Sequence, residues 1–193
     1  MSEPSVMNPA ARTVLLYWRA LAGAPEGQAR DLFLQGALGE ARYARIRRAA
    51  NGKPYILPAE ADPCPPHFSL THTRGLLACA VADVPVGLDA EAADRIVSPL
   101  LARRILSEPE QAAYAVLPEE QRSGFLLLRW VLKEAHLKRT GEGVSGNMAR
   151  LTAMADGRIA DAAGNTLSYL AADRLAGYLV AAACEAPITL RWR

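Results

Sequence analysis

A run of small and apolar residues, 75–91 (GLLACAVADVPVGLDAE), constrains the fold of this chain more than any other feature. Such a run is typical of strands that are buried on both faces. Asp83 and Pro85 interrupt it, and a proline has no N–H to donate within a sheet. The run therefore predicts two successive buried strands, separated at residues 83–85.

The second of these strands ends in two acidic residues, Asp89 and Glu91. Residues i and i+2 of a strand point to the same face, about 6.5–7 Å apart. Two carboxylates held side by side repel each other unless a cation lies between them, and their hard oxygen atoms suit Mg²⁺ or Mn²⁺. Taken alone, however, the pair fits a strand end that simply reaches solvent.

Strands and helices follow one another along the rest of the chain. Strand-forming residues dominate 12–18 and 67–72, and Asn51-Gly52 with Pro54 marks a turn. Helices are predicted at 25–42, 98–106, 108–117 and 122–140, and short strands within 149–164, 166–184 and 187–193. The fold class is α+β, with a joint near residue 84 that divides the chain into halves 1–84 and 85–193.

The composition is that of an ordinary globular protein. Of the 193 residues, 51% are hydrophobic and the net charge is +2 at pH 7, which argues against a nucleic-acid partner. The three cysteines form no C-x-x-C pair, so neither a disulfide framework nor a zinc site is predicted. The first residues do not resemble a secretory signal, and no run approaches the roughly 18 apolar residues of a membrane span. We expect a cytoplasmic protein with no membrane association.

The strongest predicted helix, 122–140, carries a second candidate group. Trp130, Glu134 and Lys138 are four residues apart, so they lie along one side of the helix. Glu134 could act as a further oxygen ligand or as a base, and Lys138 as a cation facing a phosphate. The simpler interpretation of the spacing alone is a surface Glu–Lys pair, which contributes only about 0.3–0.5 kcal/mol. His136 is expected on the surface of this helix.

Two further segments, 68–73 and 141–146, each fit more than one interpretation. In FSLTHT (68–73), His72 lies between two threonines. It is either a structural residue, which is the commoner case for a single histidine, or a donor to phosphate at a strand end. GEGVSG (141–146) matches G-x-G-x-x-G but follows a helix, whereas a dinucleotide-binding fingerprint must follow a strand. These glycines predict a helix C-terminus and a loop.

Taken together and in this order, five segments resemble the 4′-phosphopantetheinyl transferases of the surfactin-synthetase-activating (Sfp-like) type. They lie between about Arg30 and Val144 and read NGKPYI, FSLTHT, VGLDAE, RILSEPEQAAY and FLLLRWVLKEAHLKRTGEGVS. They are similar to the family's G-K/R-P turn, F-x-x-S-H-S strand, G-[IV]-D-[IV]-E strand and F-x-x-x-W-x-x-K-E-A-x-x-K helix followed by G-x-G-L. The resemblance implies two similar α+β halves in a pseudo-twofold arrangement, with the active site in the cleft between them.

The resemblance also implies a reaction and a set of residues. The enzyme would transfer the 4′-phosphopantetheine arm of coenzyme A to a serine of an apo acyl or peptidyl carrier protein and release adenosine 3′,5′-bisphosphate. Asp89, Glu91 and Glu134 would hold Mg²⁺, with Mn²⁺ as a substitute, and Glu134 and Lys138 would be catalytic. Contacts to coenzyme A are implied for Arg30, Lys53, Pro54, Thr71, His72, Asp89 and Lys138. Residues 1–84 would supply mainly nucleotide contacts, and 85–193 the metal and the catalysis.

Several residues depart from the family pattern. Thr71 and Thr73 replace two serines but keep their hydroxyl groups. Ala90 replaces the branched residue between the two acids and points to the opposite face, so the metal site is expected to be unchanged. The basic stretch before the first helix is missing, and Arg45, Arg47 and Arg48 (45–48) are expected to replace it only in part. Glu110 matches a family acid near the site.

Carrier proteins are usually acidic, so a docking surface of complementary charge is needed. We expect it within Ile96–Phe125, around Arg103, Arg104 and Leu106. A monomer would be sufficient, because the two halves are fused. Two alternatives stay open: a catalytically impaired homologue that only binds coenzyme A, suggested by the short N-terminal region, and a metal-dependent phosphodiesterase, which the three acids alone would permit.

Overall fold

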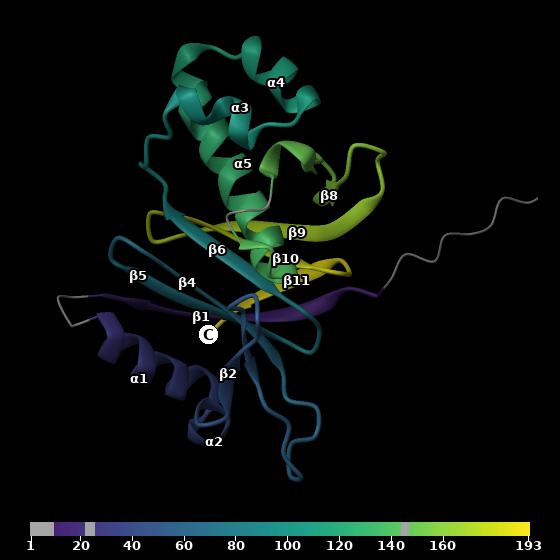
Figure 1. Ribbon diagram of the computed structural model, residues 1–193. Coiled ribbons are helices and arrows are strands. Elements are labelled where there is room, and N and C mark those ends of the chain that lie inside the picture. Colours follow the sequence, from purple (N-terminus) through teal and green to yellow (C-terminus); the bar gives the residue numbers. More distant parts are fainter. Residues whose placement is uncertain (1–9, 22–25, 144–146) are drawn as a thin grey trace, which may run out of the picture.

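The computed structural model describes residues 10–21, 26–143 and 147–193. It contains two β-sheets packed face to face, and a helix covers the outer face of each sheet (Figure 1). The predicted α+β class is confirmed. The protein thus contains two layers, each a helix on a sheet.

The first sheet contains four strands in the order β11-β1-β5-β4. Their bounds are β1 (Arg12–Ala20), β4 (His67–Thr73), β5 (Leu76–Ala82) and β11 (Ile188–Trp192). Strand β5 is antiparallel to both β1 and β4, whereas β11 runs parallel to β1. The sheet therefore takes its last strand from the far end of the chain, which the division into 1–84 and 85–193 did not foresee.

The second sheet contains five strands in the order β6-β10-β9-β8-β7, and all of its pairs are antiparallel. Their bounds are β6 (Gly87–Ala92), β7 (Thr152–Ala153), β8 (Arg158–Ala160), β9 (Thr166–Leu175) and β10 (Tyr178–Cys184). The chain leaves the first sheet after Ala82 and enters the second at Gly87, so the predicted break at 83–85 is confirmed. That residues before and after this break have different roles stays a prediction.

A small hairpin and several helices complete the chain. The hairpin consists of β2 (Ile46–Arg48) and β3 (Pro54–Ile56). The helices are α1 (Glu26–Leu38), α2 (Glu40–Tyr43), η1 (Pro99–Leu101), α3 (Ala102–Ile105), α4 (Glu108–Ala115), α5 (Glu119–Thr140) and η3 (Met148–Arg150). The predicted helix 25–42 is interrupted at Gly39, whose φ of 84° is not helical. Gly141 ends α5 with a φ of 79°, as predicted, whereas residues 144–146 of the glycine-rich segment lie outside the described residues.

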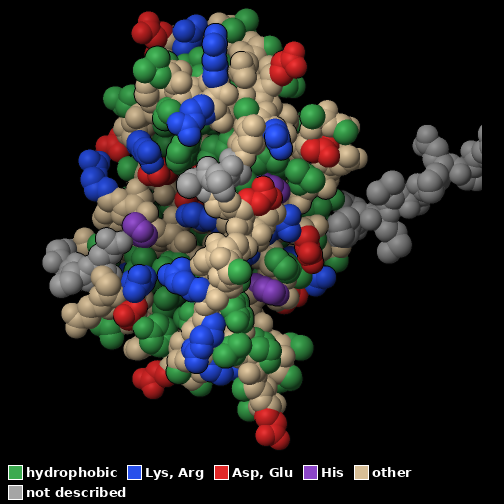
Figure 2. Space-filling model, viewed as in Figure 1, with side chains coloured by type: hydrophobic (Ala, Val, Ile, Leu, Met, Phe, Trp, Pro, Cys, Tyr) green, Lys and Arg blue, Asp and Glu red, His purple; other side chains and the backbone are tan. Residues whose placement is uncertain are grey.

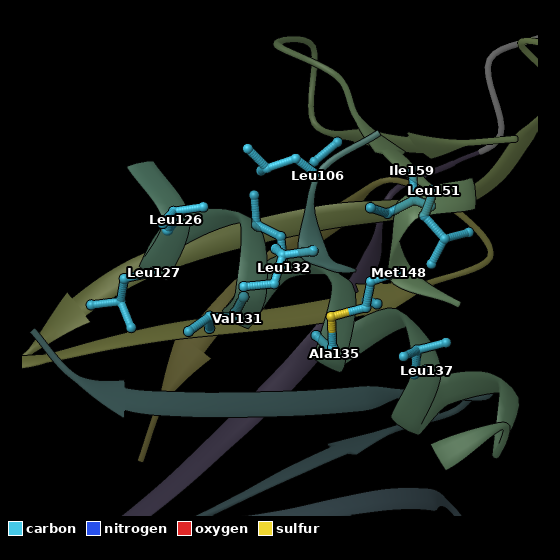
Figure 3. Packing of buried hydrophobic residues seen from close by; sticks show 14 of the residues in the cluster. Leu106, Leu126, Leu127, Val131, Leu132, Ala135, Leu137, Met148, Leu151 and Ile159 are labelled. Carbon is cyan, nitrogen blue, oxygen red and sulfur yellow. The ribbon is translucent and has the colours of Figure 1, made fainter. Parts of the chain in front are cut away.

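Three hydrophobic clusters hold these layers together. Small side chains such as Ala78, Ala80 and Ala182 fill the space between the two sheets. The opposite face of the first sheet packs against α1, and the opposite face of the second sheet packs against α5. Figure 3 shows the last of these clusters, in which α5 contributes Leu126, Val131, Leu132 and others. Helix α5 is thereby fixed between the second sheet and the short helices α3 and η3.

The described surface carries charges of both signs and some exposed apolar side chains, among them Ile96, Leu100 and Val116. Figure 2 shows basic and acidic side chains interspersed over one face of the molecule. None of the helices in the described part of the chain is long and apolar enough to cross a membrane. The three cysteines are free thiols, with Cys64 exposed and Cys79 and Cys184 buried.

Candidate active site

Strand β6 brings the two predicted acids to one place. Asp89 is buried and the side chain of Glu91 is 14% exposed, while Ala90 between them points into the core between the sheets. The alternation of β6 is therefore as predicted, with both acids on one face. This face meets strand β4 of the first sheet.

Three hydroxyl groups on one face of β4 bind β6. The Ser69 Oγ accepts a hydrogen bond from the Leu88 backbone N–H at 3.0 Å. The Thr71 Oγ1 lies 3.2 Å from Asp89 Oδ1, and the Thr73 Oγ1 donates to Glu91 Oε2 at 2.9 Å. Residues 69, 71 and 73 share a face because side chains alternate along a strand. The edges of the two sheets are thus joined at the two acids.

Helix α5 supplies the remaining predicted groups. The Lys138 Nζ donates to Asp89 Oδ1 at 2.7 Å and to Thr71 Oγ1 at 2.9 Å. Glu134 lies one turn earlier and is 6% exposed, close enough to Asp89, Glu91 and Lys138 to interact with their charges. Lys138 is therefore not the partner of Glu134 in an isolated surface pair. The structure brings Thr71, Asp89, Glu91, Glu134 and Lys138 together where the two sheets meet.

Burial controls the ionisation of two of these acids. It raises the pKa of Asp89 above its ordinary value; Glu91 adds to the rise, while Lys138 and Thr71 oppose it. Burial likewise raises the pKa of Glu134, helped by Asp89 and Glu91 and opposed by Lys138. Carboxylates that are buried beside like charges hold protons more tightly. A cation placed among them would relieve both effects.

The carboxylate oxygen atoms of this group suit a divalent cation, although the acids do not yet surround one. Asp89 Oδ2 and Glu134 Oε1 are buried and have no hydrogen-bond partner, which is costly unless a ligand satisfies them. In the described part of the chain, however, no three His, Cys, Asp or Glu side chains are grouped closely enough to hold a metal ion. The carboxylate of Glu91 is instead bound by Arg95 and Thr73. Metal binding by Glu91 would therefore compete with its ion pair to Arg95.

The predicted nucleotide contacts lie on the side of the first half. Lys53 follows an Asn51–Gly52 turn and extends its Nζ to the carbonyl oxygen atoms of Val86, at 3.5 Å, and Arg139. Pro54 begins β3 and is half-buried. Lys53 is thus placed beside β6 and the end of α5.

The other two predicted nucleotide contacts are exposed. His72 lies on the face of β4 opposite Thr71, because side chains alternate along the strand. Arg30 is exposed on α1 and pairs with the adjacent Asp31 at 3.3 Å. Roles for Arg30, Lys53, Pro54 and His72 in binding a nucleotide stay predictions.

Two residues of this region have surroundings that differ from those expected. His136 was expected on the surface but is buried, with its Nδ1 2.7 Å from the Ser168 Oγ. Glu110, expected near the site, is buried at the start of α4, where it accepts a hydrogen bond from the Ser107 backbone N–H. Glu110 is also bound by Lys133 and by the Ala153 backbone N–H. These partners, like Ser168, come from distant parts of the chain, so the helical pattern alone could not reveal them.

Other residues that contact the acidic group or its neighbours were not predicted from the sequence. Ser69 joins β4 to β6, and Arg95 pairs with Glu91 while its guanidinium lies 5.5 Å from the Trp130 ring centre. Lys133 is completely buried beside Glu134. The burial of Lys133 could have been predicted from the sequence, because this residue lies on the same face of the helix as the apolar Leu126 and Leu137, which are both buried.

Comparison with known proteins agrees with this geometry. Residues 85–179 match the sequence model of the 4′-phosphopantetheinyl transferase superfamily. The chain is 32% identical over 103 residues to the 4′-phosphopantetheinyl transferase psf-1 of Bacillus pumilus, a match that covers 53% of this chain and 42% of that protein. It is also 32% identical over 94 residues to a 4′-phosphopantetheinyl transferase of Bacillus subtilis, covering 49% of this chain and 40% of that protein.

A solved structure is also similar, that of holo-[acyl-carrier-protein] synthase from Thermotoga maritima. The TM-score is 0.44 at 22% identity, over 54% of this chain and 64% of that one. The chain spans less than half the length of the two Bacillus relatives that it matches. Through the matched region, which contains β6 and α5, the chain is similar to the 4′-phosphopantetheinyl transferase superfamily, the family whose motifs it resembles.

Proposed function

We propose that the protein transfers the 4′-phosphopantetheine arm of coenzyme A to a serine of an apo acyl or peptidyl carrier protein, in a reaction that depends on Mg²⁺. One observation carries the proposal. Asp89, Glu134, Lys138 and Thr71 meet at the junction of the two sheets, with two buried carboxylate oxygen atoms left unpartnered. Such a group suits a bound diphosphate and its cation, and it lies in and beside the region that matches the superfamily.

The proposed reaction has a defined balance of bonds. The serine oxygen attacks the phosphorus that carries the pantetheine arm, the bond from this phosphorus to the bridging diphosphate oxygen breaks, and adenosine 3′,5′-bisphosphate leaves. Asp89, Glu91 and Glu134 would hold Mg²⁺, which supplies neutralisation of the diphosphate charge. Glu134 accepts the serine proton, since burial makes its carboxylate more basic than an exposed one. Lys138 offsets negative charge on the diphosphate and the leaving group.

The nucleotide end of coenzyme A is proposed to lie against the first half. Lys53 and Pro54 are placed beside β6 and the end of α5, next to the acidic group. His72 and Arg30 lie further out on β4 and α1 and would reach the phosphate on the ribose. Thr71 contacts Asp89 and Lys138 directly, so its hydroxyl acts at the diphosphate end and not only beside the ribose phosphate.

The carrier protein is proposed to dock on the segment between β6 and α5. Ile96 and Leu100 are 83% and 90% exposed there, and Arg103 and Arg104 are exposed on α3. Apolar side chains next to basic ones suit an acidic partner with some apolar surface. Leu106, which we expected to take part, is completely buried and is removed from this surface.

The direct test is to incubate the protein with coenzyme A, Mg²⁺ and several apo carrier proteins and to determine the carriers' masses. A gain equal to the phosphopantetheine arm on a serine supports the proposal. If no carrier gains mass while coenzyme A still binds, the impaired homologue is favoured. Hydrolysis of phosphodiesters without transfer favours the phosphodiesterase. Each of these last two outcomes contradicts the proposal.

The role of Glu134 is tested with Glu134→Gln. The amide keeps the size of the side chain but cannot accept the serine proton, so transfer is expected to be lost. Circular dichroism should show an unchanged fold. Near-normal turnover would contradict the assignment of Glu134 as the base.

A further inference from the structure

The residue before the proposed base is a lysine that has no contact with solvent. Lys133 is 0% exposed, and its ammonium group donates to the Ile105 carbonyl oxygen at 2.6 Å, to the Met148 carbonyl oxygen at 3.2 Å and to the carboxylate of Glu110. An ammonium group has three N–H donors, and here each has an acceptor. These acceptors come from α3, α4 and η3, so one atom of α5 joins three separate elements.

Glu110 is itself fully engaged. Its carboxylate accepts from the backbone N–H groups of Ser107, at 2.9 Å, and Ala153, at 3.0 Å, and forms an ion pair with Arg129 at 3.2 Å. Arg129 lies one turn before Lys133 on α5. Arg129 and Lys133 of α5 therefore both pair with the carboxylate of Glu110. That carboxylate is also hydrogen-bonded to the backbone at the start of α4 and in β7.

This anchor fixes the rotation of α5 about its own axis. Consecutive residues of a helix point about 100° apart. Lys133 points into the acceptors of α3, α4 and η3, whereas Glu134 is buried on the part of α5 that Lys138 fixes to Asp89 of β6, one turn further on. A rotation of α5 would move the ammonium group away from these three acceptors. The direction of Lys133 therefore sets the direction of Glu134.

Stability alone does not account for a lysine at this position. Removing an ion pair from water offsets much of its attraction, and well-packed apolar side chains are often at least as stabilising. Leu126 and Leu137 occupy the same stripe of α5 and are both completely buried. Apolar contacts have no preferred direction, however, whereas the three hydrogen bonds of the ammonium group do.

We infer that Lys133 is a positioning residue, which acts through α5 to hold Glu134 in the direction that the acidic group on β6 requires. The inference rests on the proposed function, because it assigns Lys133 a purpose in metal binding and proton transfer. Lys133 itself is proposed to contact neither the substrate nor the cation.

Lys133→Met tests the inference, because methionine keeps most of the length and removes the donors. Mn²⁺ binding is measured from the electron paramagnetic resonance signal of the free ion, and kcat and the KM for coenzyme A from transfer assays. We expect about tenfold weaker Mn²⁺ binding and a similar fall in kcat, which is the usual effect of replacing a residue that orients the metal-binding side chains. The KM for coenzyme A should change less than about twofold, because its proposed contacts lie mainly on the other sheet.

Leu16→Ala is the matched control, since Leu16 is equally buried but lies between the sheets. It should lower stability while leaving Mn²⁺ binding unchanged. Equal losses of Mn²⁺ affinity in both variants, or unchanged affinity and kcat in a folded Lys133→Met protein, would overturn the inference. Should Lys133→Met fail to fold, Glu110→Gln removes the partner charge and is expected to give the same pattern, more weakly.

The wild-type protein separates this inference from the proposed function. If it binds Mn²⁺ but modifies no carrier, the proposed reaction is wrong, and the difference in Mn²⁺ affinity still tests Lys133. If the wild-type protein does not bind Mn²⁺, both proposals are overturned.

Discussion

At the scale of single residues, His136 shows how strongly burial can change a side chain. Its Nδ1 lies 2.7 Å from the Ser168 Oγ, which also accepts a hydrogen bond from the Arg139 Nε at 2.7 Å. His136 and Arg139 therefore share the Ser168 hydroxyl group as a hydrogen-bond partner. Burial, with a smaller contribution from Arg139, lowers the pKa of His136 to about 4.

This pKa predicts a loss of stability in mild acid. In the unfolded chain the imidazole gains a proton near pH 6.5, whereas in the folded protein it stays neutral down to about pH 4. The unfolded state binds more protons between these values, so the free energy of unfolding falls as the pH falls through them, by roughly 3 kcal/mol. His136→Gln should remove this contribution. Urea unfolding of both proteins at pH 7 and pH 4.5 measures it, and parallel pH dependences would contradict the prediction.

Arg95 is expected to compete with the cation for Glu91. Its guanidinium forms an ion pair with that carboxylate and reduces the negative charge that Glu91 offers to a metal. Arg95→Gln should therefore tighten Mn²⁺ binding about three- to tenfold, measured by calorimetry on the protein without substrates. Arg122→Gln removes an arginine that instead bonds to the carbonyl oxygen atoms of Leu117 and Ala115, and it should leave the affinity unchanged. Weaker binding in Arg95→Gln would contradict the expected competition.

The sequence predicted the acids of the site better than their surroundings. Strand alternation placed Asp89 and Glu91 on one face, and the four-residue spacing placed Glu134 and Lys138 on one side of a helix. The contacts of Ser69, Arg95 and Lys133 depend on packing between segments. Lys133, for example, meets a carbonyl oxygen 28 residues earlier and another 15 residues later. Local periodicity contains no information about such partners.

At the scale of elements, the site depends on the close approach of β6 to α5. Gly87 begins β6, and a Cβ atom built there would lie 1.9 Å from the Ala135 carbonyl oxygen and 2.4 Å from the Arg139 backbone nitrogen. Both are backbone atoms, which cannot move aside without displacing the helix. Glycine at this position therefore allows the distance at which Asp89 reaches Lys138.

Gly87→Ala is accordingly expected to separate the strand from the helix. We predict a loss of about 4 kcal/mol or more in the free energy of unfolding, together with loss of transfer activity. Gly124→Ala is the matched control, because Gly124 lies within α5 with no atom within 4 Å of a Cβ built there. That substitution should stabilise the protein by about 0.5–1 kcal/mol, through better helix propensity. A Gly87→Ala protein as stable as the wild type would show that the strand and helix can separate freely.

The segment between β6 and α5 gives a prediction about the carrier protein. Replacing both Arg103 and Arg104 by Glu reverses the charge of the proposed docking surface, and the KM for an acidic carrier should rise about tenfold or more. The KM for coenzyme A should stay the same, because the nucleotide is proposed to bind the other half. Arg191→Glu on β11 is the control, since Arg191 is exposed on the first sheet. Equal effects of the two changes would exclude a specific surface on α3.

Elements with strong periodicity were predictable, and long-range pairings were not. The helix 122–140 and the strands on either side of Asp83–Pro85 were predicted from their patterns. The helix 25–42 was predicted as continuous because Gly39 is compatible with a helical pattern, but its positive φ divides α1 from α2. The pattern of 187–193 indicated a strand, whereas its pairing with β1, 176 residues earlier, depends on the whole fold.

At the scale of the whole molecule, the two halves share a core. Val14 and Ala80 of the first sheet and Leu88 and Val180 of the second are buried in one cluster between the sheets. Strand β11 follows β10 of the second sheet but pairs with β1 of the first. Neither half can bury its inner face alone, so residues 1–84 and 85–193 are not independently folding units.

We therefore predict a single cooperative unfolding transition. Trp18 on β1 reports on the first sheet, and Trp130 on α5 reports on the second half. In proteins that keep only one tryptophan, with the other two changed to Phe, each residue should show a transition that coincides with the loss of circular dichroism. Coincident transitions in different probes are the mark of two-state unfolding. Two separate midpoints, with one half unfolding first, would show that the shared core and β11 do not couple the sheets. The acidic group lies where these sheets meet, so coupled unfolding also means that the site is assembled only in the fully folded protein.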